Sequence, residues 1–263
     1  MPHAAERIYT AIGSSPSGKQ LEVGSRMRDL LEIMWQRHSC RAPFDPDRKI
    51  REHELQRILD AARWSPTVHN AQNFEIIVVD DKRRLKEISA IQLPPSETFD
   101  VDDFRELSFS EAEVLRHKTG LLAGMFPASW QEEDGGQELG SGARRTYLGR
   151  TIPMCAALLV VIYDSRMRCA EGDTLGNMSL GCVMQNVWLM AESLGISTQV
   201  LSAVSEIEIA NRVRRLLDVP GHMNVAFAVR LGYRVTASER HLRVRRGIED
   251  FTHRNRYAQR GIE

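Results

Sequence analysis

The chain has 263 residues, and its 35 basic and 35 acidic side chains give a formal net charge of zero. Hydrophobic residues make up 42% and charged residues 27%, which excludes an intrinsically disordered chain. The longest apolar run, residues 154–163, is shorter than the roughly 18 residues that a membrane helix needs. Residues 1–20 contain no apolar signal core, so we expect a cytoplasmic protein that does not associate with membranes.

Arginine supplies most of the positive charge, with 30 arginines and five lysines. Because a guanidinium group binds oxyanions with a rigid fork, clustered arginines favour a phosphate ligand. Residues 230–260 contain nine arginines and three acids, which makes the C-terminal segment basic. A solvated surface explains this segment equally well, and a phosphate- or nucleic-acid-binding module is a further alternative. The net charge of zero counts against a nucleic-acid-binding function.

The first elements follow from hydrophobic spacing. Residues 1–25 are small and polar, which predicts a mobile N-terminal arm. Apolar residues at helical spacing predict one helix that starts near residue 26 and ends before Pro43, and a second helix that ends before Pro66. Residues 74–79 are typical of a buried strand, and a short helix follows them.

Residues 92–150 lose this pattern and predict a long insertion, which would act as a lid or binding loop. We expect it to carry one helix, because Ser110 and Glu113 form a capping box. Residues 158–163 predict a second strand, and residues 174–194 predict the longest helix. That helix is apolar almost all round, so it is buried on several faces, either in the core of one chain or in a dimer.

The last predicted elements are a third strand over residues 198–201, a helix that begins with a capping box of Ser205 and Glu208, and a fourth strand over residues 225–231. Helices outnumber strands and alternate with them irregularly. The pattern therefore predicts an α+β class, built around a small sheet in one domain over residues 26–263.

Two polar clusters could carry chemistry. In residues 37–41, two arginines flank a serine, and together they offer a guanidinium fork, a hydroxyl and backbone amides to a phosphate. Residues 65–72 form a polar loop between a helix and a strand, where Asn70 and Gln72 suit the edge of a heterocycle. A solvated helix end and ordinary turn chemistry are the respective alternatives.

Other kinds of site find less support in the sequence. The four cysteines match neither a metal knuckle nor a disulfide framework, so we expect free thiols. The eight histidines are scattered, and we expect no metal site. No glycine-rich dinucleotide fingerprint is present.

Taken together, these stretches resemble the nitroreductase family of FMN-dependent oxidoreductases. Residues 37–41 are similar to its opening motif, residues 50–72 to the helix and loop that follow, and residues 179–196 to its long central helix. Residues 231–233 and 243–246 resemble its last strand and basic tail. The resemblance implies a small, mostly antiparallel sheet flanked by helices, with the long central helix at a dimer interface.

The resemblance also implies contacts to FMN. The residues that would hold its phosphate and ribityl chain are Arg37, His38, Ser39, Arg243 and Arg245. Arg41 would lie by the N1 and O2 edge of the flavin ring, where a fixed positive charge raises its reduction potential. The contacts from the other subunit of a homodimer would come from Pro66, Thr67, Val68 and Asn70. Gln72 is a further contact, and the backbone contacts near N5 match Ser202 and Ala203.

The function that this resemblance implies is hydride transfer from NADH or NADPH, through the flavin, to a small-molecule acceptor in a ping-pong reaction. Nitroaromatics, quinones and similar flat electron-poor rings are the expected acceptors. Since flavin N5 carries the hydride, no side chain is assigned as a catalytic acid or base. The alternative within flavin chemistry is a dehydrogenase or tailoring enzyme for a dedicated metabolite.

Overall fold

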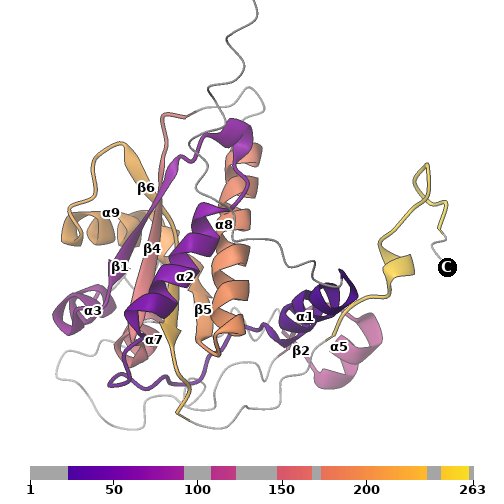
Figure 1. The fold of residues 1–263 in the computed structure, drawn as a ribbon, viewed down its shortest axis with the longest axis horizontal. Helices are drawn as coiled ribbons and strands as arrows, with labels where there is room; N and C mark the ends of the chain where they lie inside the picture. The colour runs from indigo at the N-terminus through magenta and orange to yellow at the C-terminus, as the bar shows by residue number, and fades with distance from the viewer. Residues whose placement is uncertain (1–22, 92–107, 123–146, 168–172, 236–243, 261–263) are drawn as a thin grey trace, which may run out of the picture. The chain divides into compact units, whose positions relative to one another are not determined.

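The computed structural model describes residues 23–91, 108–122, 147–167, 173–235 and 244–260 (Figure 1). These residues belong to two compact units, one that ends at Arg37 and one that begins at His38. Nearly all of the predicted N-terminal arm and most of the predicted insertion lie outside the described residues. In the first unit, α1 (Val23–Gln36) exposes its apolar side chains Leu30, Leu31, Met34 and Trp35.

The second unit is built around a four-stranded antiparallel sheet in the order β1-β4-β6-β5. The strands are β1 (Phe74–Val79), β4 (Ala157–Asp164), β6 (Met223–Gly232) and β5 (Ser197–Leu201). Each strand matches its predicted range to within two residues. The two central strands, β4 and β6, are largely apolar runs, which are typical of strands that are buried on both faces. The predicted α+β class with a mostly antiparallel sheet is confirmed.

Helices cover both faces of this sheet. On one face, α2 (Glu52–Arg63) and α8 (Asp173–Ser193) lie side by side and pack on Leu159 and Val161 of β4. On the other face, Leu158 and Val160 contribute to a core with three further helices. Those helices are α3 (Lys82–Ser89), α7 (Tyr147–Thr151) and α9 (Ile207–Leu216).

The ends of several helices test the predicted caps. Ser110 caps α5 (Glu111–His117) in a capping box with Glu113, as predicted. The box predicted at Ser205 is wrong, because the Glu206 side chain caps α9 by accepting from two backbone amides. Gly195 follows α8 with a φ of 69°, a left-handed conformation that glycine adopts without strain.

The remaining elements are short. Inside the predicted insertion, β2 (Ser108–Phe109) pairs in parallel with β3 (Leu121–Leu122), and α7 adds a helix that the sequence pattern did not indicate. Single 3₁₀ turns are η2 (Val68–Asn70), η5 (Ile152–Met154), η6 (Ser202–Ser205) and η7 (Ile248–Asp250).

Candidate functional site

The first predicted cluster follows α1, and its backbone is held at two points. Arg37 is the last residue of the first unit. Within the second unit, the Cys40 amide donates a hydrogen bond to the carbonyl of Thr198 on β5, at 2.8 Å. The indole Nε1 of Trp188 on α8 donates to the carbonyl of His38, at 3.2 Å. The predicted phosphate segment therefore runs between β5 and α8.

A third anchor on this segment comes from Arg230 on β6, whose side chain is 1% exposed. Its guanidinium donates to the carbonyls of Cys40 at 3.0 Å, Ala42 at 2.9 Å and Thr151 at 3.0 Å. Two of these carbonyls flank Arg41. Sequence reasoning missed Arg230, although a charged residue within an otherwise apolar strand was a signal that it has a specific partner.

The side chains of this segment suit an anionic ligand. His38, Ser39 and Arg41 are half-buried, and none of the residues 37–41 is acidic. A hydroxyl and a guanidinium donate hydrogen bonds to the oxygens of a phosphate and to the acceptor atoms of a flavin ring. Burial raises the pKa of the Cys40 thiol, which keeps it neutral and unreactive at physiological pH. The donor set therefore fits FMN.

The second predicted cluster, the loop over residues 65–72, is fastened to α8. The Asn186 side-chain amide donates to the Ser65 hydroxyl at 3.0 Å, and the Val68 amide donates to the Ser179 hydroxyl at 3.0 Å. Since a helix turns about 100° per residue, Ser179 and Asn186 lie on the same face of α8.

This loop has an unusual backbone. His69, Asn70 and Gln72 have φ values of 49°, 55° and 46°, a left-handed conformation that costs free energy for residues with a Cβ. The Gln72 amide donates to the Thr67 hydroxyl at 3.1 Å, and the Gln72 side chain donates to Asn70 Oδ1 at 3.0 Å. Within the described residues, Asn70 Nδ2 and Gln72 Oε1 are left to bind a ligand. Strain of this kind is concentrated at functional sites.

The other predicted residues occupy varied positions. Pro66 is exposed and Thr67 and Val68 are half-buried in the same loop. Ser202 is exposed at the start of η6, directly after β5, and Ala203 packs against the core. Arg245 is exposed and donates to the carbonyl of its neighbour Val244. Arg243 lies outside the described residues, so its role and that of Arg245 stay predictions.

The two clusters contact opposite faces of α8. Trp188, which binds His38, is nine residues from Ser179, which binds Val68. At about 100° per residue, nine residues correspond to half a turn beyond two full turns. The structure brings the His38–Arg41 segment to β5 and β6, but it does not bring the loop over residues 65–72 to that segment within one chain.

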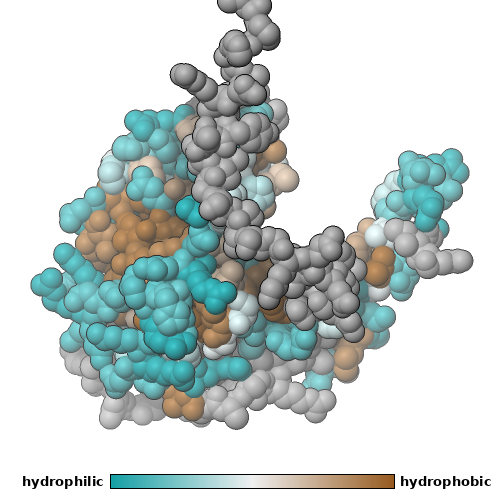
Figure 2. All heavy atoms as spheres, viewed as in Figure 1, coloured by the Kyte–Doolittle hydropathy of each residue, from teal (hydrophilic) through white to brown (hydrophobic). Residues whose placement is uncertain are grey.

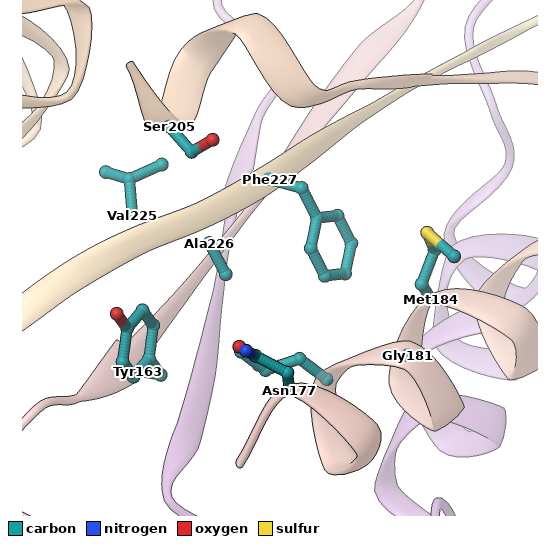
Figure 3. Close-up of a pocket in the computed structure, with 9 residues that line it drawn as sticks. Tyr163, Asn177, Gly181, Met184, Ser205, Val225, Ala226 and Phe227 are labelled. Carbon is teal, nitrogen blue, oxygen red and sulfur yellow. The ribbon is translucent and has the colours of Figure 1, made fainter. Parts of the chain in front are cut away.

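A cavity of about 360 Å³ lies elsewhere, between α8 and β6 (Figure 3). Its polar side chains are Tyr163, Asn177 and Ser205, and Phe227 forms part of its apolar wall. Ala226 also lines the cavity. It is the extra residue of a β-bulge in β6, because Phe227 and Val225 pair with two consecutive residues of β4 and leave Ala226 without a partner in the ladder. None of the predicted site residues lines this cavity.

Across the described ranges, no group of three or more His, Cys, Asp or Glu side chains could hold a metal ion. No helix among the residues that the structure describes is long and apolar enough to cross a membrane. Cys40, Cys155 and Cys182 are free thiols, and Cys169 lies outside the described residues.

Comparison with known proteins gives the family. A family model described as the nitroreductase family matches residues 34–233. An oxygen-insensitive NADPH nitroreductase from Helicobacter pylori is 22% identical over 206 residues, which cover 78% of this chain and 87% of that protein. A shorter match, 42% identical over 52 residues, covers 20% of this chain and 24% of a CLA biosynthesis enone reductase from Lactiplantibacillus plantarum.

A solved structure agrees in fold. It is a protein from Desulfovibrio desulfuricans assigned as a nitroreductase, in complex with FMN, and it has a TM-score of 0.52 and 16% identity. The match covers 87% of this chain and 97% of that one. The family match over most of the chain defines an oxidoreductase, and the antiparallel sheet between two helical layers agrees with the fold of the solved relative. The chain belongs to the nitroreductase family, which confirms the predicted family and fold.

Proposed function

We propose that this protein is a homodimeric FMN-dependent oxidoreductase that uses NADH or NADPH to reduce small electron-poor molecules. The observation that carries the proposal is the placement of the two clusters on opposite faces of α8. The two anchors on α8 are nine residues apart, which is about 13 Å along the helix axis, and the helix itself lies between them, so one ligand would have to pass around α8 to reach both clusters of a single chain. A second copy brings the loop of one chain to the phosphate segment of the other.

The surface beside α8 supports association of two copies. Figure 2 shows hydrophobic surface over β1, β4 and β6, next to α2 and α8. Phe74, Ile76 and Val78 of β1 are only partly buried there, and Met178 on α8 is 61% exposed. Contiguous apolar surface of this kind is typical of an interface between subunits.

The relatives support the cofactors. One curated relative is an NADPH nitroreductase, and the solved relative contains FMN. When bound, FMN supplies a ring that accepts hydride from a reduced nicotinamide and passes it to a second substrate. Arg37, His38 and Ser39 would bind its phosphate, and Arg41 would place a fixed positive charge at the ring edge. Asn70 of the other chain would donate to the ring.

The acceptors follow from the same site. A pocket vacated by a nicotinamide ring accommodates another flat ring, which favours nitroaromatics and quinones in a ping-pong reaction. The short match to an enone reductase adds conjugated ketones as a second class of acceptor. In that reaction the hydride reduces a carbon–carbon double bond next to a carbonyl group.

The test is a visible absorption spectrum of the purified protein, repeated without oxygen after adding NADH or NADPH. We expect a flavin spectrum that bleaches, and then returns on addition of a nitroaromatic, a quinone or an enone. A flavin that stays oxidised would favour the alternative function, a dehydrogenase whose flavin is reduced by a dedicated metabolite and not by NADH or NADPH. A colourless protein that does not take up FMN would contradict the proposal and favour the phosphate- or nucleic-acid-binding alternative. Sedimentation of the loaded protein as a monomer would contradict the shared site.

A further inference from the structure

Arg230 is a charged side chain at the centre of the sheet. It lies between Val229 and Leu231 on β6, and it pairs with Leu158 on β4 and Gln199 on β5. Removing a guanidinium group from water costs free energy unless its donors are satisfied. Arg230 offsets part of this cost by donating to three backbone carbonyls, which come from two separate segments of the chain.

The carbonyls that accept hydrogen bonds from Arg230 determine the backbone position of Arg41. One nitrogen, Nη2, donates to the carbonyls of both Cys40 and Ala42, the residues on either side of Arg41. The side chains of Cys40 and Ala42 are buried, whereas that of Arg41 is half-buried. The backbone around Arg41 is thereby held so that its neighbours face the core and Arg41 does not.

Phe44 keeps the Arg230 guanidinium in place. Its ring is fully buried, and the guanidinium carbon of Arg230 lies 4.1 Å from the ring centroid. Contact between a guanidinium group and an aromatic face is attractive and restricts the rotamers of the arginine. Phe44 is in turn held by the bond from its amide to the carbonyl of Met154 at the end of η5, at 3.1 Å.

We propose that Arg230 is a positioning residue, which aims Arg41 at the edge of the flavin by holding the carbonyls of Cys40 and Ala42. This inference rests on the proposed function, since it needs FMN beside Arg41. Arg230 is buried beneath the segment and does not contact the cofactor. Its effect on FMN is therefore transmitted through Arg41.

A double-mutant cycle tests this transmission. The variants are Arg230→Met, which removes the donors and keeps an unbranched apolar stem, Arg41→Ala, and the double variant. Two quantities are measured for each: the Kd for FMN, by quenching of FMN fluorescence on titration with apoprotein, and the midpoint potential of the bound flavin. The control is Val229→Ala, which removes atoms from the same strand in the core of α2 and α8, whereas Cys40 and Ala42 belong to the core on the other face of the sheet.

We expect Arg230→Met to raise the Kd by about tenfold or more and to shift the potential to a more negative value, and Arg41→Ala to do the same. The double variant should match Arg41→Ala alone, because residues that act as one unit are not additive. Arg230→Lys keeps the charge and can donate to a carbonyl. Its Kd for FMN and its flavin potential should therefore lie between those of Arg230→Met and the wild type. Val229→Ala should leave the potential unchanged.

Additive effects of Arg230→Met and Arg41→Ala would overturn the proposal and leave the proposed function standing. A potential that shifts equally in Val229→Ala would also overturn it, because the effect would then be one of stability alone. If Arg230→Met does not fold, the same cycle is completed with Arg230→Lys. A wild-type protein that does not bind FMN would instead overturn the proposed function, and this inference with it.

Discussion

Gly232, at the end of β6, lies directly against the ring of Phe44. A Cβ atom at position 232 would come within 2.8 Å of both Cβ and Cδ2 of Phe44. The ring cannot move away freely, since its face is covered by the Arg230 guanidinium. Close approach of the chain at this point also allows the Asp45 amide to donate to the carbonyl of Tyr233, at 2.7 Å.

Replacing Gly232 by alanine should therefore destabilise the protein. We expect Gly232→Ala to lower the free energy of unfolding by about 1 to 3 kcal/mol, the usual cost of overpacking a core, measured by denaturant titration. The control is Gly221→Ala, because a Cβ at position 221 meets no atom within 4 Å. Equal stability of the two variants would show that Phe44 can shift without cost.

The bond between Trp188 and His38 gives a second prediction. Trp188→Phe keeps an aromatic ring on α8 but removes the donor to the His38 carbonyl. We expect a loss of about 1 kcal/mol in stability and weaker FMN binding, since the phosphate segment loses one anchor. Trp35→Phe, at an exposed position on α1, is the control. The affinity for FMN is measured by calorimetric titration. Equal affinities of the two variants would argue against an anchoring role of Trp188.

Ser179 holds the strained loop. Ser179→Ala removes the acceptor of the Val68 amide, so we expect the loop to open more often and this amide to exchange its hydrogen faster. Ser193→Ala is a matched change on the same helix, because among the described residues the Ser193 hydroxyl bonds to Met190 of its own turn. Hydrogen exchange of the loop is the measurement. Equal rates in both variants would mean that the loop is held by other contacts.

Glu54 predicts a pH dependence of stability. The Arg51 guanidinium and the Tyr233 hydroxyl donate to its buried carboxylate, and the pKa of Glu54 falls to about 2. A lowered pKa means that this contribution is present above the ordinary pKa of 4.5 and is lost as the pH falls towards 2. Stability of the wild-type protein should therefore decline across that window.

Two variants check the cause of this decline. Glu54→Gln should be less stable than the wild type at neutral pH and should show a flatter profile between about pH 5 and pH 2. The stability of Tyr233→Phe at neutral pH should lie between that of the wild type and that of Glu54→Gln, because Arg51 still lowers the pKa of Glu54. Thermal unfolding as a function of pH is the measurement. A profile for Glu54→Gln as steep as that of the wild type would assign the acid sensitivity to other carboxylates.

The predicted phosphate ligands can be tested separately. Arg37→Ala and Arg245→Ala should each weaken FMN binding by about 1.5 to 3 kcal/mol, the worth of one charge-assisted hydrogen bond. Arg57→Ala, an exposed arginine on α2, is the control for the loss of one positive charge. Unchanged affinity in either variant, relative to this control, would remove that arginine from the phosphate site.

The sequence by itself determined the strands of the main sheet, most of the helices and the family. The strands β1, β4 and β6 and the helix α8 were predictable because their apolar runs are long, and such runs are buried wherever the chain folds. The motif over residues 37–41 and the loop over residues 65–72 were visible as polar clusters next to these runs. The start of α9 was predicted wrongly, because Ser205 is of a residue type that commonly caps helices, whereas the side chain that accepts from the first amides of α9 is that of the next residue, Glu206.

Only the tertiary structure decided how the clusters are held. Arg230 is 190 residues from Cys40 along the chain, and no local pattern links a strand arginine to the carbonyls of a distant loop. The opposite faces of α8 became evident only once Ser179 and Trp188 had partners, since the helix itself is apolar almost all round. Hydrophobic spacing specifies which residues are buried, whereas hydrogen bonds between distant segments depend on how the buried elements pack.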